Sequence, residues 1–324
     1  MLISVVVPVR DGAGHLPALL DGLDRQELDA AAFEVLVVDD GSTDGTAALV
    51  EGWAARDPER RRLLRTTGVG PAAARNVGVA QSRGDWVAFT DGDVVPDPGW
   101  LAELAAACAD PTVEAIEGRI EVAAADRDAA DAFDHVVANT TGGLYMTANM
   151  AYRRSLLDRL GGFDERFTDP FLEDSDLAFR ALDEGVSIPF LAPAVVYHPV
   201  RRSTPAAALR GARRARWLAP FAAKHPDRYA TELRPSLRAL TRVDFDVLAA
   251  LVASAALPRA RGAVRLAALA AIANALRHAR SEGRLDAPPA ERPARLLLTF
   301  ALPPWKLYWL AVGAVRASSG GWSR

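Results

Sequence analysis

The feature that most constrains the fold is a regular alternation of strand and helix patterns over residues 3–91. Ile3–Val9 is a continuous apolar run rich in β-branched residues, which is typical of a strand covered on both faces. The following stretches alternate with short connections, and this predicts a parallel, doubly wound α/β sheet. We expect strands at 33–38, at 62–66 and before Asp91, and helices from about Leu16, around 47–53 and near 71–80.

The pattern after Asp91 is less regular. Residues 113–122 predict one or two strands, and 144–152 predict another. A short helix at 155–160 should stop at the glycine pair that follows it. A helix is expected at 171–182, and 188–198 should return as an extended segment.

The charges divide the chain into an acidic front and a basic rear. The formal net charge of the 324 residues is −3, but residues 1–200 hold 34 acids against 16 bases, and residues 201–324 hold 7 acids against 22 bases. We therefore predict a catalytic domain at 1–204 and a basic, apolar helical region at 205–324. Such a rear is suited to a phosphate-bearing or membrane surface, or it docks on the acidic domain.

Two features bear on the cellular compartment. Cys108 is the sole cysteine, so no intramolecular disulfide can form, which fits a reducing compartment. Residues 1–9 lack a basic flank and a full-length apolar region, so they indicate a strand instead of a signal peptide.

Four carboxylates stand where predicted strands end. Asp39 and Asp40 follow the second strand, and Asp91 and Asp93 follow the fourth, separated by Gly92. Ligands of doubly wound sheets bind outside these strand ends, and the four acids would repel one another without a cation or donor groups. Residues two apart in extended chain project to the same side, so Asp91 and Asp93 can share one magnesium or manganese ion. Taken alone, the same three residues are also typical of an acidic turn.

Two later stretches carry further candidates. Glu173 and Asp174 open a predicted helix, where the helix dipole favours acids and where an ionised carboxylate can accept a proton from a hydroxyl. Asp176 with Arg180 forms an ordinary i,i+4 pair. His198 closes an extended segment, and a neutral imidazole is a suitable third ligand beside two aspartates.

Taken together, these motifs resemble the family 2 glycosyltransferases, which have the GT-A fold. The resemblance covers about the first two hundred residues, in family order. The matching stretches are 5–9, 37–46, 70–78, 84–93, 149–153, 161–165 and 173–180.

The resemblance implies a binding site for a nucleoside-diphosphate sugar, with uridine and thymidine diphosphates as the first candidates. Pro8 and Gly92 would line this site. Asp39 and Asp40 would lie near the base and ribose, and Arg75 would lie close to the nucleotide.

It also implies the catalytic groups. Asp91 and Asp93 would form the metal-binding DxD motif for magnesium or manganese, with His198 near the metal and diphosphate. Asp174 would be the general base of an inverting transfer to an acceptor hydroxyl, with Glu173 as its substitute.

One departure concerns the nucleotide. The aromatic residue and asparagine that the family usually has after the first strand are replaced by Arg10 and Asp11. The base preference is therefore open.

The rear of the chain suggests where the enzyme works. Arg210, Arg213, Arg214 and Trp217 would share one helix face. The apolar stretches 247–257 and 263–276 are too short or too broken to span a bilayer, and 296–315 contains Pro303, Pro304 and Lys306. Its aromatic residues, which favour the membrane interface, are Trp305, Tyr308 and Trp309.

We therefore expect helices that pack together or lie on an anionic membrane surface. This predicts a cytoplasmic protein, peripheral on the inner face of the membrane, with a lipid-linked or cell-envelope glycan as acceptor. Nucleic acid is not an expected partner.

Three other functions remain open. Residues 68–73 fit the glycine pattern of a nicotinamide-dependent oxidoreductase, with Asp93 about twenty residues further on. A metal-dependent phosphatase would use Asp91 as nucleophile. A non-catalytic scaffold would only bind a nucleotide sugar.

Overall fold

The computed structural model describes residues 1–123, 126, 134, 136–201, 204–233, 242–256, 262–281, 283, 292–318 and 322. These residues form two compact units. The first contains 1–127 and 136–200, and the second contains 128–135 and 201–324.

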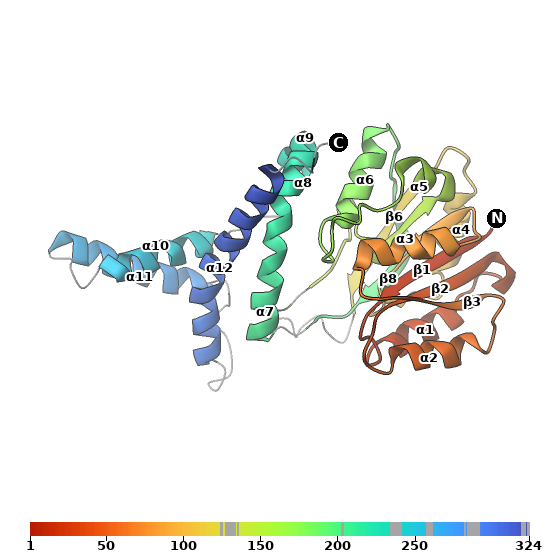
Figure 1. Ribbon diagram of the computed structural model, residues 1–324, viewed down its shortest axis with the longest axis horizontal. Coiled ribbons are helices and arrows are strands. Elements are labelled where there is room, and N and C mark those ends of the chain that lie inside the picture. Colours follow the sequence, from red (N-terminus) through yellow and green to blue (C-terminus); the bar gives the residue numbers. More distant parts are fainter. Residues whose placement is uncertain are drawn as a thin grey trace. The chain divides into compact units, whose positions relative to one another are not determined.

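The first unit (Figure 1) is built on a sheet. This sheet has eight strands in the order β3-β2-β1-β4-β7-β6-β8-β5. β3, β2, β1 and β4 are parallel, as predicted. The other half is mixed, because β7 runs antiparallel to both β4 and β6, and β5 runs antiparallel to β8. The predicted α/β fold is confirmed, with these reversals as additions. The strands are β1 Ile3–Val9, β2 Phe33–Asp40, β3 Arg61–Thr66, β4 Trp86–Phe89, β5 Val95–Pro96, β6 Ala115–Val122, β7 Met150–Arg153 and β8 Phe190–His198.

Helices cover both faces of this sheet (Figure 1). One face packs against α1, α2 and α4, and the other packs against α3, α5 and α6. The helices are α1 Leu16–Asp24, α2 Thr46–Ala54, α3 Pro71–Gln81, α4 Trp100–Cys108, α5 Arg154–Leu160 and α6 Glu173–Asp183. Short 3-10 helices lie at Ala30–Ala32 and Thr147–Asn149.

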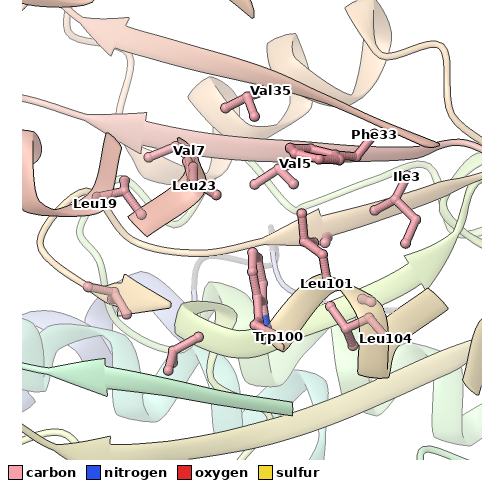
Figure 2. Close-up of a cluster of buried hydrophobic side chains, with 14 of the residues drawn as sticks. Ile3, Val5, Val7, Leu19, Leu23, Phe33, Val35, Trp100, Leu101 and Leu104 are labelled. Atoms are coloured by element: carbon pink, nitrogen blue, oxygen red, sulfur yellow. The ribbon is translucent and has the colours of Figure 1, made fainter. Parts of the chain in front are cut away.

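The alternation of side chains along β1 explains its continuous apolar sequence. Val5 and Val7 point into the core shared with α1 and α4, where Figure 2 shows them near Leu19 and Trp100. Val6, between them, belongs to the core on the opposite face. A strand covered on both sides needs apolar residues at every position, as the sequence predicts.

Helix α4 was not among the predicted elements. It places Trp100 and Leu101 in the core shared with β1 and α1 (Figure 2). The helix ends at Cys108. The Cys108 thiol is buried, and burial raises its pKa to about 12. This cysteine is therefore a protonated core residue near neutral pH.

The second unit is helical in its described parts. Its elements are α7 Pro205–Ala212, a 3-10 helix Arg213–Trp217, α8 Leu218–Lys224, α9 Pro226–Arg228, a π-helical turn Tyr229–Leu233, α10 Arg242–Ala256, α11 Ala263–Ser281 and α12 Arg292–Ser318. Helices were predicted over 205–324, including the apolar stretch 247–257. Some of these residues, such as Leu257, lie outside the described part of the chain.

The predicted cationic face from Arg210 to Trp217 is wrong. The α-helix gives way to a tighter 3-10 helix at Arg213, so the 3.6-residue spacing is lost. The Trp217 ring is buried and packs near Trp322 within the same unit.

Helix α12 continues through Pro303 and Pro304, two of the residues that interrupt the apolar stretch 296–315. Figure 1 shows that the helix changes direction part-way along, as proline within a helix causes. Among the described helices, α12 is the one whose length and apolar composition would suffice to cross a membrane.

Candidate active site

The parallel strands bring the predicted carboxylates to one edge of the sheet. Val9 pairs with Asp39 in the β1–β2 ladder, and Val6 pairs with Phe89, the last residue of β4. The chain after β4 turns closely over the end of β1, because a Cβ added at Gly92 would lie 3.1 Å from a Val9 methyl carbon. Gly92 therefore permits this approach.

Asp91, Asp93 and His198 form a cluster at this edge. Their candidate ligand atoms all lie within 4.8 Å of one another. The short strand β5 explains the arrangement, since Val95 pairs with Tyr197 and so brings the Asp93 segment beside the end of β8. The His198 Nε2 atom lies 3.7 Å from Asp93 Oδ2, and both side chains are buried.

The orientation of the His198 ring would allow it to bind a metal ion. Its Nδ1 lies 2.8 Å from the carbonyl oxygen of Pro199. A carbonyl can only accept, so the neutral ring carries its hydrogen on Nδ1 and presents the Nε2 lone pair on the side of Asp93. Two carboxylates and this nitrogen fit a divalent ion such as manganese or magnesium.

Arg75, from α3, connects this cluster to the acids of α6. Its guanidinium donates to Asp91 over 3.0 Å and to Glu173 over 2.8 Å. Burial alone would lower the pKa of Arg75, but the carboxylates of Glu173 and Asp91 reverse this and raise it. Arg75 thus stays charged and holds two acids from separate elements together.

The acids of α6 begin directly after a strained residue. Leu172, which precedes the helix, has a left-handed backbone with φ of 74°, an uncommon conformation for a side chain of this size. Glu173 is buried, whereas Asp174 is half-buried and accepts from the backbone N–H of Ser175 over 2.7 Å.

Burial raises the pKa of both acids, and the charge of Glu173 adds to the effect on Asp174. The pKa of Asp174 rises to about 7. A carboxyl group of this kind can take up a proton near neutral pH. Asp176, by contrast, is fully buried and paired with Arg180, as the i,i+4 spacing predicts.

Asp40 organises the loop that leads to α3. Its carboxylate accepts from the Thr66 hydroxyl over 2.6 Å and from the N–H groups of Val69 and Gly70 over 2.7 and 2.9 Å. Burial would raise the pKa of Asp40, but these hydrogen bonds outweigh it and lower the pKa. Asp39 accepts from the Ser42 N–H over 3.0 Å.

This loop also explains the glycine pattern at 68–73. Gly68 and Gly70 have φ of 83° and 97°, which glycine adopts without strain. The N–H groups of Val69 and Gly70 are directed to the Asp40 carboxylate. A dinucleotide fingerprint would direct such groups to a pyrophosphate, so the local geometry does not support the oxidoreductase alternative.

Arg10 and Asp11, which depart from the family pattern, both lie at the same edge of the sheet. Asp11 has a left-handed backbone, donates its N–H to Ser42 over 2.8 Å and accepts from the Thr43 N–H over 2.7 Å. The Arg10 guanidinium is exposed and lies over Gly68, since a Cβ there would be 2.9 Å from its Nη1.

Comparison with known sequences decides the family. Residues 4–161 match the profile of Glycosyl transferase family 2, and residues 86–312 match that of Glycosyl transferase family group 2. The chain belongs to the family 2 glycosyltransferases. The resemblance seen in the sequence motifs is thereby confirmed.

Individual relatives agree with this family. The chain is 32% identical over 243 residues to the pre-mycofactocin glycosyltransferase of Mycobacterium tuberculosis, a match that covers 70% of this chain and 49% of that protein. The chain therefore spans about half the length of this relative.

Two solved structures share the fold. The mannosyltransferase PcManGT from Pyrobaculum calidifontis, solved with GDP-Man and Mn2+, matches with a TM-score of 0.64 and 24% identity over 98% of this chain and 86% of its own. TarS 1–349 of S. aureus, solved with UDP, matches with a TM-score of 0.54 and 19% identity over 99% of this chain and 92% of its own.

Proposed function

We propose that this protein transfers a sugar from a nucleoside-diphosphate sugar to an acceptor hydroxyl, with inversion at the anomeric carbon. The observation that carries the proposal is the contact of Arg75 with both Asp91 and Glu173. Asp91 belongs to the candidate metal site, and Glu173 is next to Asp174 in the chain. A donor diphosphate at the cluster and an acceptor hydroxyl at Asp174 would then be close enough to react.

The donor would bind at the carboxyl edge of the sheet. A divalent ion held by Asp91, Asp93 and His198 would supply positive charge beside the diphosphate. Asp39 and Pro8 would contact the nucleoside, and Asp40 would support them by ordering the neighbouring loop. The family expectation favours uridine or thymidine diphosphates, and the complexes of the two neighbours, with GDP-Man and UDP, support nucleotide sugars as a class.

The acceptor would be activated by Asp174. Its carboxylate takes the hydroxyl proton while the acceptor oxygen forms a bond to the anomeric carbon. The bond from that carbon to the diphosphate oxygen breaks on the opposite face, and the diphosphate leaves with the electron pair. Attack from the face opposite the leaving group inverts the configuration. Glu173, paired with Arg75, would fix the start of α6 and so the position of Asp174.

The acceptor would be a lipid-linked or cell-envelope glycan, reached from the cytoplasmic face of a membrane. The excess of bases after residue 200 and the apolar helices of the second unit support this location.

The test is an assay of donor use by the purified full-length chain. UDP-, dTDP- and GDP-sugars would be presented with manganese, with magnesium and with EDTA, and release of nucleoside diphosphate measured. We expect metal-dependent release from one nucleotide class, and NMR of the product should show the inverted anomer.

Asp174→Asn should abolish transfer while donor binding persists. Asp183→Asn, an exposed position on the same helix, is the matched control.

Equal inactivity toward all donors with and without metal would overturn the proposal. Binding of NAD, or hydrolysis of simple phosphate esters, would direct attention to the oxidoreductase or phosphatase alternatives. Metal-dependent donor binding without any turnover would instead support the scaffold alternative.

A further inference from the structure

The exposed apolar side chains are concentrated on three helices of the second unit. Among the described residues, 14 large apolar side chains are exposed, and 11 of them lie on α10, α11 and α12. Soluble proteins rarely gather so many on a few elements without a partner for them. The 11 side chains are Phe245, Leu251, Val252, Leu266, Leu269, Leu296, Leu297, Trp305, Leu307, Tyr308 and Val315.

Helix α12 has one packed side and one open side. Leu298 and Leu302 are buried in a small core with Ala212 of α7. Tyr308 and Val315 lie seven residues apart after the proline pair, which places them on one face, and Leu297 lies before it; the exposed fractions of Leu297, Tyr308 and Val315 are 71%, 54% and 71%. Both parts of the helix therefore expose large apolar side chains.

An aromatic group lies in the middle of α12. The rings of Trp305 and Tyr308 are stacked with centroids 5.4 Å apart, and Trp309 meets both edge-on. The Trp305 indole donates to the carbonyl of Leu209 over 3.0 Å, which fixes its orientation. Tryptophan and tyrosine with one apolar and one polar end favour the region between lipid headgroups and acyl chains.

The residues of α11 and α12 that carry a full charge are all basic. Residues 263–281 and 292–318 contain seven arginine and lysine residues and no acid. The two acids of α10 are already paired, Asp244 with Lys306 over 2.9 Å and Asp246 with His278. α11 and α12 therefore combine exposed apolar side chains with an excess of basic residues.

We infer that the open faces of α10, α11 and α12 dock on an anionic lipid bilayer. An apolar surface needs an apolar partner, and among the large apolar side chains in the described part of the first unit only Met1, Val69 and Val136 are exposed. A second copy would bring the same positive charge. A bilayer with anionic headgroups provides both the acyl chains and the negative charge.

The same contacts indicate that α12 lies on the bilayer instead of spanning it. Lys306, near its middle, is paired with the fully buried Asp244 of α10, and Leu298 and Leu302 are packed within the unit. A spanning helix would have to break these contacts and place Lys306 in the hydrocarbon region. This inference adds a docking surface and a type of lipid to the membrane location given under the proposed function. It rests on the proposed function only where it concerns a lipid-linked acceptor.

The experiment is co-flotation of the full-length chain with vesicles, without donor or metal. Vesicles of phosphatidylcholine with about one-third phosphatidylglycerol would be compared with phosphatidylcholine alone. We expect at least tenfold tighter binding to the anionic vesicles, weakened by raising the salt concentration.

Leu297→Ser combined with Val315→Ser should weaken binding by roughly tenfold or more, because two exposed apolar side chains are lost from the docking face. Val136→Ser, an equally conservative change at an exposed position of the first unit, should leave it unchanged.

Other outcomes would overturn the inference. Absence of vesicle binding by a chain that still binds or hydrolyses a donor would exclude the membrane surface without affecting the proposed reaction. A dimer in solution that the Leu297 and Val315 changes dissociate would assign the face to a second copy. Resistance of the membrane-bound chain to alkaline carbonate extraction would show that α12 spans. Circular dichroism of each variant separates loss of docking from loss of folding.

Discussion

The Arg75 guanidinium ties Asp91 to Glu173, donating to the first over 3.0 Å and to the second over 2.8 Å. Removal of this side chain would leave two acids close together, one of them buried, without a counter-charge. We expect Arg75→Ala to lower the free energy of unfolding by about 3–5 kcal/mol, as for other broken buried ion pairs. Urea denaturation would measure this loss.

The matched control is Arg65→Ala. Arg65 pairs with Glu51, and both side chains are more than half exposed. Its loss should cost less than about 1 kcal/mol, because solvent screens exposed pairs. Equal effects of the two changes would contradict a structural role for the Arg75 bridge.

The pKa of Asp174 makes transfer dependent on pH. The base must be ionised, so in the free enzyme activity should be low below pH 7 and should rise as pH passes through about 7. A profile of kcat/KM against pH would measure this limb. A flat profile between pH 5.5 and 8.5, with chemistry shown to limit the rate, would remove Asp174 from the role of base.

The same shift has a consequence for stability. The pKa of Asp174 is raised in the folded state above its ordinary value of 3.8. The native state then holds the proton more tightly than the unfolded state, so this group's contribution to stability is lost as pH rises from about 4 to about 7. Asp174→Asn should therefore raise the unfolding midpoint relative to the native chain at pH 8 and have little effect at pH 4. Thermal denaturation at the two pH values tests this prediction.

His198 should contribute to metal binding and not only to the packing at this edge of the sheet. We expect His198→Ala to weaken manganese binding by at least about tenfold, measured by calorimetry without donor. His15→Ala, at an exposed position after β1, should have no effect. Unchanged manganese affinity in the His198 variant would reduce the cluster to its two carboxylates.

Arg10 should contribute to nucleotide binding. Its exposed guanidinium lies at the carboxyl end of β1, over Gly68 and beside Asp40, whose pKa it helps to lower. We expect Arg10→Ala to raise the Kd of the preferred nucleoside diphosphate roughly three- to tenfold, the size of one stacking or hydrogen-bonding contact. The control is Arg56→Ala, because Arg56 is exposed and follows the C-terminal end of α2. Equal affinities of the two variants would place Arg10 outside the nucleotide site.

The parts of the structure that depend on nearby residues could be predicted from the sequence. The apolar run Ile3–Val9 predicts strand β1. The spacing of Asp91 and Asp93 after β4 predicts that both carboxylates can bind the same ion. Alanine and leucine dominate Trp100–Cys108, and this signal is sufficient for helix α4, which the predicted elements omit. The antiparallel direction of β7 could not be predicted, because residues 150–153 show the pattern of a strand whichever way it runs.

The functional contacts depend on residues far apart in the chain. Arg75 and Glu173 are separated by 98 positions, so neither residue type nor spacing reveals their contact. Asp40 was assigned to the nucleotide, and no pattern around it shows that Val69 and Gly70 donate to its carboxylate. The placement of Asp40 near the base and ribose stays a prediction, to which the structure adds a role in ordering the loop.

The position of Cys108 at the end of α4 makes this chain convenient for chemical labelling. Its thiol is enclosed and protonated near neutral pH, so it should react slowly with maleimides in the folded protein. A cysteine introduced at Val315 or at Val136 would be the one reactive thiol, and an environment-sensitive fluorophore attached there would report whether that position meets acyl chains or water.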